Sequence, residues 1–377
     1  MKKIKLAVIF GGMSTEHDVS IASATAIIKN LNKQKYDINP IYIDRDGKWY
    51  KYTRDVNKIE KLKVGEKIQE IEKLENIIEY LRQLDCIFPV LHGLYGEDGT
   101  IQGLFELLKV PYVGCRLLAS CLAMDKVYSK IIFEKAGLKQ APYIYIRKTK
   151  NNYIFVDKNF AETTYSIDEI INIAEKQLKY PMFVKPSNSG SSVGISKVEN
   201  KKELEKAIEY AAKFDKKILI EQGIIGREVE CAVLGNEDVV AGSVGEVLSA
   251  EEFYSYDSKY NNKQSKTQIP ANLEEEILEH IKEQARKAFK AIDGSGLARV
   301  DFFIEDKTNN ILINEINTMP GFTDISMYPK LFENAGIKYS QLLDILIKLA
   351  MWHNWDAPFL FDLFLLLHLI AILKWYI

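Results

Sequence analysis

The sequence predicts an α/β protein with more than one domain, and three observations support that prediction. At 377 residues the chain is too long for one typical domain and suits two or three. Two short apolar runs, residues 5–12 and 86–93, are separated by amphipathic helical stretches, which is typical of a parallel α/β unit. In the second half of the chain, strand signals follow one another across short turns, which favours antiparallel pairing.

Composition excludes several classes of protein. Hydrophobic residues make up 47% of the chain and charged residues 27%, as in soluble globular proteins. A net charge of -2 argues against broad nucleic-acid binding, which needs a basic surface. The four cysteines are scattered without CxxC spacing, which fits reduced thiols in the cytoplasm and gives no zinc signature.

The N-terminal domain is predicted to span residues 1–115 and to be a parallel α/β domain. Its first apolar run, Leu6–Phe10, is too short for a signal-peptide core and is interpreted as a buried strand. The stretch 11–31 reads as a glycine turn that feeds a helix. Thr15 and Asp18 have capping-box-like spacing at the start of that helix.

A central α+β domain is predicted over residues 116–225. It begins with a helical segment, 117–138, and continues with a strand, a glycine-serine loop and a second strand over 180–198. A charged helix with an Ala/Ile face follows at 201–214. Residues 217–235 alternate as two antiparallel strands with a turn at Gly226.

A second α+β domain with an antiparallel sheet is predicted over residues 226–350. The polar segment 247–270 is long for an inert connection, and such loops are often functional lids. A helix is expected over 273–292. The two apolar stretches that follow it are expected to pair as a hairpin across residues 307–310.

The last hairpin strand, in "ILINEINTMPGFTDIS", carries two polar residues on one face. Side chains at positions i and i+2 of a strand point the same way, so Glu315 and Asn317 lie together. Asp301 lies on the partner strand. Two carboxylates and an amide oxygen are hard ligands that suit Mg²⁺. The alternative is an edge strand whose polar groups are solvated, and the segment alone does not decide between them.

The glycine-serine loop of "VKPSNSGSSVGISKV" is a candidate phosphate site. Glycine-rich turns expose backbone amides and hydroxyls that form anion-binding nests, and Lys185 could reach a phosphate as a point charge. The Walker pattern GxxxxGK[ST] is absent. A simple hairpin is the alternative, and the nucleotide hypothesis depends on the neighbouring cation site.

Two further loops are candidates for ligand binding. "HGLYGEDG", which begins at His92, follows a buried strand, where open α/β sheets bind ligands; a tight turn with a satisfied histidine is the alternative. In "DSKYNN", Lys259 and Tyr260 could close over a ligand, and an ordinary solvated loop is the alternative.

Taken in order, eight motifs resemble the D-alanine–D-alanine ligase family of the ATP-grasp superfamily over roughly residues 3–350. The family includes the D-Ala-D-Ser and D-Ala-D-Lac ligases of vancomycin resistance. The motifs are "AVIFGGMSTEHDVS", "FPVLHGLYGEDGTIQG", "GCRLLASCLAMDK", "VKPSNSGSSVGISKV", "EQGIIGREVECAVLG", "YDSKY", "GLARVDFF" and "NEINTMPGFTDIS".

The resemblance implies a three-domain ATP-grasp architecture and a reaction. ATP phosphorylates the carboxylate of a first D-alanine, and the amine of a second D-amino acid displaces phosphate from the acyl phosphate. Positioning and charge neutralisation dominate such chemistry. The resemblance also implies two Mg²⁺ ions, for which Mn²⁺ can substitute, a homodimer, and a role in peptidoglycan precursor synthesis.

The resemblance assigns roles to individual residues. The metal ions would be held by Asp301, Glu315 and Asn317. The ATP phosphates would be contacted by Lys126, Lys185 and Ser192. Adenosine would be bound by Glu221, Gln222, Ile224 and Glu228. The first substrate and the lid would be served by Glu16, His92, Ser191, Lys259 and Tyr260. The tetrahedral oxyanion would be stabilised by Arg299 and the Gly321 N–H, and the second substrate would be anchored by Ser326.

The sequence departs from the family pattern in two places. Gln222 and Gly223 stand where the family commonly has a lysine and a bulky residue. Because adenine is bound there largely through backbone, we expect altered packing and not lost binding. Asp324 and Ile325 stand where many members have Ser-His, which leaves the second-substrate pocket less defined.

The second substrate is expected to be an amino acid. Ligases that use a hydroxyacid lack the Lys259–Tyr260 pair. D-Alanine is predicted, and D-serine stays open because D-Ala-D-Ser ligases share a similar lid. A non-catalytic nucleotide-binding regulator is a further alternative, which would be expected to lose metal ligands or Arg299; all are present.

The C-terminal tail, residues 351–377, is far more apolar than the rest of the chain and matches nothing expected in the family. Its apolar stretch, Phe359–Ile377, is marginal as a spanning helix because Asp362, His368 and Lys374 interrupt it. A buried or partner-packed helix, a membrane-associated tail, and a sequence foreign to the folded enzyme are all left open.

Overall fold

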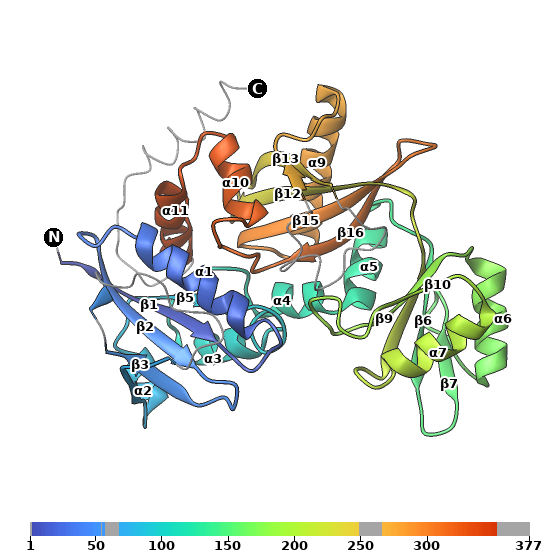
Figure 1. The fold of residues 1–377 in the computed structure, drawn as a ribbon, viewed down its shortest axis with the longest axis horizontal. Coiled ribbons are helices and arrows are strands. Elements are labelled where there is room, and N and C mark those ends of the chain that lie inside the picture. Colours follow the sequence, from blue (N-terminus) through green and yellow to red (C-terminus); the bar gives the residue numbers. More distant parts are fainter. Residues whose placement is uncertain (1, 54, 57–67, 249–265, 353–377) are drawn as a thin grey trace.

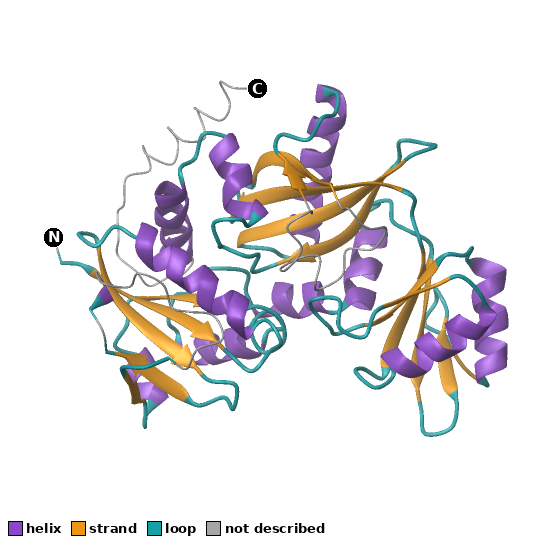
Figure 2. Ribbon diagram, viewed as in Figure 1, coloured by secondary structure: helices purple, strands orange, loops and turns teal. Residues whose placement is uncertain are grey.

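A computed structural model describes residues 2–53, 55–56, 68–248 and 266–352. The described chain forms three β-sheets with helices packed against them (Figures 1 and 2). Residues of the tail beyond 352 and of the loop 249–265, including Lys259 and Tyr260, lie outside the described residues.

The N-terminal sheet has a parallel centre, as predicted. Its strand order is β4-β3-β2-β1-β5, and β1 pairs in parallel with both β2 and β5. The predicted capping box at the first helix is wrong. Glu16, and not Thr15, is the residue before that helix, so the Thr15–Asp18 spacing is out of register with the helix start, and no side chain caps it. The Ser14 hydroxyl donates to the His92 carbonyl and accepts from the Glu16 N–H. The elements are β1 (Ile4–Gly11), α1 (His17–Asn30), β2 (Tyr36–Ile43), β3 (Trp49–Tyr52), β4 (Ile71–Lys73), α2 (Ile77–Leu81), β5 (Cys86–Val90) and α3 (Thr100–Leu108).

The predicted helical segment 117–138 forms two helices, α4 (Leu117–Met124) and α5 (Lys126–Lys135). Asp125 separates them because its backbone is extended, with φ -83° and ψ 100°. Its side chain accepts the N–H groups of Val127 and Tyr128, which otherwise lack partners at a helix start. The interruption aims the first residue of α5, Lys126, toward the glycine-serine loop.

The middle sheet is antiparallel throughout, with the order β10-β9-β11-β6-β7-β8. Helices α6 and α7 contact this sheet and each other. The predicted Ala/Ile face of α7 is buried and includes Leu204, Ala207, Ile208 and Ala211. The elements are β6 (Tyr143–Lys148), β7 (Tyr153–Val156), β8 (Glu162–Tyr165), α6 (Ile167–Gln177), β9 (Met182–Pro186), β10 (Ser196–Val198), α7 (Lys201–Ala211) and β11 (Lys217–Gln222).

The third sheet has the order β14-β13-β12-β15-β16 and is also antiparallel. The hairpin predicted across residues 307–310 is confirmed as β15 and β16. The elements are β12 (Gly226–Gly235), β13 (Val240–Leu248), β14 (Lys266–Gln268), α9 (Glu275–Ala291), β15 (Gly296–Glu305), β16 (Ile311–Asn317), α10 (Met327–Asn334) and α11 (Tyr339–Trp352).

The pairing expected within residues 217–235 is wrong. Gly226 is not a turn but the first residue of β12, and β11 belongs to the middle sheet while β12 belongs to the third. Position 226 requires glycine because the backbone of Ile304 packs directly against it. A Cβ at Gly226 would lie 2.0 Å from the Ile304 carbonyl oxygen. The chain therefore crosses between two sheets at this point.

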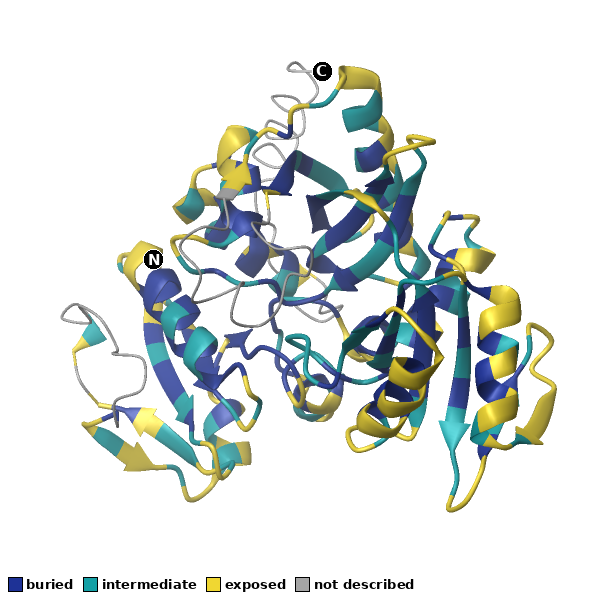
Figure 3. Ribbon diagram, turned by 45° about the vertical axis from the view of Figure 1, so that its right-hand side comes forward, coloured by how far each residue is buried: buried dark blue, intermediate teal, exposed yellow. Residues whose placement is uncertain are grey.

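One apolar core holds the first and third sheets together. Buried residues of β1 and β5, such as Phe88, share one cluster with Phe322 and with α10 and α11. Phe88 and Phe322 meet edge to face, with ring centroids 5.7 Å apart. The buried positions follow the strands, and exposed residues lie on the outer faces of helices and loops (Figure 3). This packing fixes the loops that leave β5 and β16 beside each other.

Candidate active site

One large cavity, with a volume of about 1240 Å³, lies where the three sheets meet. Every predicted site residue within the described part of the chain lines it. They are Glu16, His92, Lys126, Lys185, Ser191, Ser192, Glu221, Gln222, Ile224, Glu228, Arg299, Asp301, Glu315, Asn317, Gly321 and Ser326. Residues from sequence positions 16 to 326 therefore converge on one space.

The predicted cation ligands lie on two neighbouring strands of this cavity. Asp301 on β15 is in register with Glu315 on β16, and Asn317 is in register with Arg299. The Asn317 Nδ2 donates to Asp301 Oδ2 over 3.0 Å. Strand β16 is an edge strand, as the alternative interpretation expected, but Glu315 and Asn317 face the cavity and are half-buried.

This donor set fits a divalent metal ion. Asp301 is almost completely buried, at 3% exposure, and burying a carboxylate is costly unless a cation accompanies it. Carboxylate and amide oxygens suit Mg²⁺, which completes its coordination with water and substrate phosphates. Across the described residues no set of three or more His, Cys, Asp and Glu side chains forms a metal cluster. At this strand pair the described residues therefore offer two carboxylates and one amide.

Arg299 is the cation that accompanies these carboxylates in the structure. Its Nε and Nη2 each donate to Asp301 over 2.7 Å, in a fork-like pair. Its Nε also lies 3.1 Å from Glu230 Oε2. Burial alone would lower the pKa of Arg299, but Asp301 and Glu230 outweigh it and raise that pKa well above its ordinary value. Arg299 is a permanent positive charge on the cavity wall.

A second buried ion-pair group lies on the middle sheet. Glu221 on β11 pairs with Lys185 on β9 and with Lys130 on α5, whose Nζ is 3.0 Å away. Burial would raise the pKa of Glu221, but Lys130 and Lys185 outweigh it and lower that pKa to about 2. Sequence reasoning missed Lys130, which lies one helical turn after Lys126 and carries no motif signal of its own.

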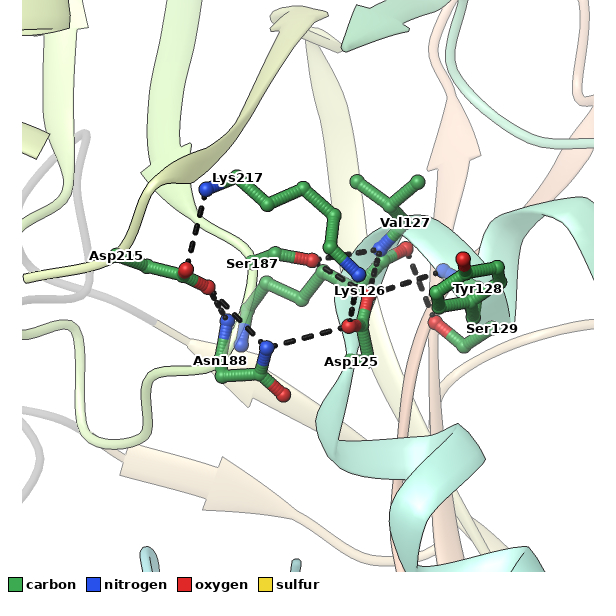
Figure 4. Close-up of polar contacts among 9 residues, drawn as sticks. All are labelled: Asp125, Lys126, Val127, Tyr128, Ser129, Ser187, Asn188, Asp215 and Lys217. Carbon is green, nitrogen blue, oxygen red and sulfur yellow. Dashed lines mark hydrogen bonds and ion pairs between the residues drawn. The ribbon is translucent and has the colours of Figure 1, made fainter. Parts of the chain in front are cut away.

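Asp125 is a second residue that sequence reasoning missed, although it stands next to Lys126 in "AMDK". Its carboxylate accepts from Ser187 Oγ over 2.5 Å and from Asn188 Nδ2 over 3.2 Å, and it pairs with Lys217 (Figure 4). Burial would raise the pKa of Asp125, but Lys217 and Ser187 outweigh it and lower that pKa. The network attaches α5 to the start of the glycine-serine loop.

The glycine-serine loop lies close to the N-terminal domain. The Lys126 Nζ donates to the Ser189 carbonyl over 2.6 Å, and Ser191 and Ser192 both have positive φ. The Ser191 hydroxyl is buried, and no hydrogen-bond partner for it exists among the described residues. A Cβ at Gly190 of this loop would lie 3.1 Å from Glu16 Oε2 and 3.6 Å from the Gly93 Cα, which places the loop against the N-terminal domain.

The loop after β16 is held by the N-terminal domain. The Met319 carbonyl lies 2.9 Å from His92 Nδ1, and the Met319 N–H donates to Glu97 over 3.1 Å. Burial lowers the pKa of His92, and burial with the neighbouring Glu16 raises the pKa of Glu97 to about 8. Glu97, which sequence reasoning did not single out within "HGLYGEDG", therefore anchors the loop that leads to Gly321.

Gly321 and Ser326 lie against each other at the end of this loop. A Cβ at position 321 would lie 2.7 Å from Ser326 Oγ, so any larger residue there would displace the Ser326 hydroxyl. The Thr323 N–H donates to Ser326 Oγ over 2.9 Å. Ser326 directly precedes α10, and a helix N-terminus favours a negatively charged ligand.

Comparison with known families matches nearly the whole described chain. Residues 5–115 match the family described as D-ala D-ala ligase N-terminus, and residues 132–348 match D-ala D-ala ligase C-terminus. The chain belongs to the D-alanine–D-alanine ligase family. The resemblance inferred from the eight motifs is thereby confirmed.

Individual relatives of this ligase family agree. The chain is 50% identical to a D-alanine–D-alanine ligase of Acetivibrio thermocellus over 373 residues, covering 93% of this chain and 96% of the relative. It is 49% identical to a D-alanine–D-alanine ligase of Clostridium novyi over 356 residues, covering 93% of this chain and 98% of the relative.

Solved structures of D-alanine ligases share the fold. A VanG D-Ala:D-Ser ligase from Enterococcus faecalis gives a TM-score of 0.80 at 38% identity, covering 93% of this chain and 100% of that one. A D-alanine–D-alanine ligase from Coxiella burnetii gives a TM-score of 0.78 at 31% identity, covering 100% of this chain and 99% of that one. The predicted ATP-grasp architecture is confirmed.

The Glu221 ion-pair group gives a prediction about pH. Since the pKa of Glu221 falls from its ordinary 4.5 to about 2 on folding, its contribution to stability is complete above pH 4.5 and is lost as the pH falls toward 2. Glu221→Gln leaves two buried lysines without their carboxylate and should lower the free energy of unfolding by about 3–5 kcal/mol at pH 7. Urea denaturation at pH 7 and pH 3 measures this; a larger loss at pH 3 than at pH 7 contradicts it.

The Asp125 network predicts a larger cost than helix capping alone. Asp125→Ala removes a helix N-cap together with the contacts to Ser187, Asn188 and Lys217. Asn200→Ala removes the exposed N-cap of α7 and one exposed hydrogen bond to Glu203. We expect the free energy of unfolding to fall by about 1 kcal/mol in Asn200→Ala and by at least twice that in Asp125→Ala. Equal losses in thermal or urea unfolding would mean that Asp125 serves as a cap and nothing more.

Proposed function

We propose that this protein joins two D-alanine molecules in an ATP-dependent reaction that yields D-alanyl-D-alanine, ADP and phosphate. The observation that carries the proposal is the meeting, in one cavity, of an acidic strand pair, Asp301 with Glu315, and a glycine-serine loop that follows Lys185 on β9. The names of the relatives at about 50% identity support the same reaction. The product would serve peptidoglycan precursor synthesis.

ATP would lie between the middle and third sheets. Residues 221–224 and Glu228 would contact adenosine, while Lys126, Lys185 and Ser192 would hold the phosphates. Asp301, Glu315 and Asn317 would hold Mg²⁺ or Mn²⁺, two ions in our proposal, which supplies charge neutralisation on the phosphates when bound. Lys185 shares the carboxylate of Glu221 and so stays charged and oriented.

The first D-alanine would lie beside α1, with its ammonium group on Glu16 and with His92 and Ser191 close by. Its carboxylate oxygen forms a bond to the γ-phosphorus of ATP, and the bond from that phosphorus to the β-γ bridging oxygen breaks, which releases ADP. The acyl phosphate then has a good leaving group. Tyr260 and Lys259, in the proposed lid, would close this side of the cavity.

The second D-alanine would be anchored by its carboxylate on Ser326. Its amine, after losing a proton, attacks the acyl carbon and gives a tetrahedral intermediate with a negative oxygen. Arg299 and the Gly321 N–H would stabilise that oxygen, and the collapse of the intermediate expels phosphate and forms the peptide bond. Asp324 and Ile325 border the same region of the cavity.

D-Serine is the second candidate for the acceptor amine. The observation that favours it is the likeness to the VanG D-Ala:D-Ser ligase structure, at 38% identity. The higher identity to D-alanine–D-alanine ligases favours D-alanine.

The homodimer, the cytoplasmic location and the domain boundaries near residues 115, 225 and 350 stay predictions. Within the described residues every helix is too short or too polar to span a membrane.

The reaction is tested by phosphate release from ATP as D-alanine is raised, with the product identified by mass spectrometry. Equimolar D-serine or D-lactate is then added as a competitor. We expect D-alanyl-D-alanine to predominate. A predominant D-alanyl-D-lactate product would contradict the proposal, and nucleotide binding without phosphate release or dipeptide would favour the non-catalytic regulator.

A matched pair of variants tests the role of Arg299. Arg299→Lys keeps a positive charge but loses the fork, so we expect kcat to fall by about 10²–10³. Arg227→Lys is the control, because Arg227 makes an equivalent pair of 2.7 Å bonds to Glu246 but does not line the cavity. Equal kcat losses in the two variants would remove Arg299 from the proposed mechanism.

A further inference from the structure

Glu230 is a buried carboxylate of the cavity to which neither the motifs nor the proposed mechanism gives a role. It lies on β12, in register with Asp301 on β15, which is in turn in register with Glu315 on β16. Three acidic side chains therefore form a row across three adjacent strands, on the face that lines the cavity. Glu230 is only 6% exposed, so its charge needs a cation close by.

Arg299 supplies that cation and is shared between two carboxylates. Its Nε lies 2.7 Å from Asp301 Oδ1 and 3.1 Å from Glu230 Oε2, while its Nη2 lies 2.7 Å from Asp301 Oδ2. Both oxygens of Asp301 are thus engaged by the guanidinium. Glu230 holds the same group from the neighbouring strand.

Asp301 faces two competing demands. In the proposed function it is a metal ligand, yet in the structure its two oxygens bind Arg299. A metal ion that takes the Asp301 oxygens weakens the hold of this carboxylate on Arg299. A buried guanidinium without a carboxylate is costly, by several kcal/mol when one partner is removed. The exchange is therefore easier if a second carboxylate stays with Arg299.

We propose that Glu230 is a positioning residue that retains Arg299 beside the reacting groups while Asp301 engages divalent metal ions. This inference rests on the proposed metal role of Asp301. Glu230 reaches Arg299 from β12, whereas the proposed ligands come from β15 and β16, so the two functions are held by different strands. If Glu230 loses its charge, Asp301 is the remaining carboxylate that hydrogen-bonds Arg299, so Arg299 competes harder with the metal for Asp301.

The test measures Mn²⁺ binding in the presence of ADP, by the electron paramagnetic resonance signal of free Mn²⁺. Glu230→Gln should weaken Mn²⁺ binding about tenfold, the size of a typical coupling within one ion-pair network. Glu246→Gln is the matched control: Glu246 is also 6% exposed and pairs with Arg227 on the same sheet, but it does not line the cavity. We expect the control to bind Mn²⁺ within about twofold of the wild type, because a change outside the network is additive.

A double-mutant cycle separates positioning from direct ligation. In an Arg299→Ala background, Glu230→Gln should no longer weaken Mn²⁺ binding, because the competitor for Asp301 is gone. A tenfold loss that persists in that background would make Glu230 a metal ligand and overturn the proposal. Glu230→Asp keeps the charge but retracts it by one methylene. The affinity of this variant for Mn²⁺ should therefore lie between the affinities of the wild type and of Glu230→Gln.

Failure of this inference can be told from failure of the proposed metal site. If Asp301→Asn binds Mn²⁺ as the wild type does, the proposed metal role of Asp301 is wrong. If Asp301→Asn loses binding while Glu230→Gln and Glu230→Asp both bind as the wild type does, Glu230 has no positioning role. The Glu230→Asp variant keeps the test decisive should Glu230→Gln fail to fold.

Discussion

Carboxylates gathered on a buried sheet face repel one another, and the cavity of this protein is organised by the cations that offset that repulsion. Arg299 lies between Asp301 and Glu230 on the third sheet, and Lys130 and Lys185 flank Glu221 on the middle sheet. A buried charge is tolerated when it is paired and hydrogen-bonded. The same arrangement leaves acidic oxygens and lysine ammonium groups facing a common space, which suits a nucleotide and its metal ions.

The fold brings these groups together through loops at strand ends. The loop after β5 supplies His92 and Glu97, and both contact the backbone of Met319, in the loop after β16. Ser23 on α1 accepts the Phe322 N–H, which holds the far side of the same loop. The backbone around Gly321 is therefore fixed by the N-terminal domain. In the proposed mechanism this couples the binding of the first substrate to stabilisation of the oxyanion.

Features that depend on local patterns could be predicted from the sequence. The alternation that places Glu315 and Asn317 on one face, and the hairpin that brings Asp301 beside them, both follow from strand geometry and a short turn. The parallel centre of the first sheet follows from two apolar runs separated by helical stretches. The order of eight motifs identified the family, which no single loop could do.

Features that depend on tertiary register could not be predicted. Lys130 and Glu230 matter because of what lies opposite them on another element, and no spacing in the sequence reveals that. The turn expected at Gly226 failed because a glycine required by a close backbone contact looks the same as a turn glycine. The capping box expected at Thr15 failed because the helix begins at His17, which makes Glu16 the N-cap residue.

The proposed function requires the strand pair β15–β16 to hold divalent metal ions, and anomalous diffraction would locate those ions. Crystals grown with ADP and Mn²⁺ would be measured near the manganese absorption edge. We expect anomalous peaks within about 2.3 Å of oxygens of Asp301, Glu315 and Asn317, since oxygen ligands of Mg²⁺-type sites lie about 2.0–2.1 Å from the ion. Bound ADP with manganese peaks only at other residues would contradict it.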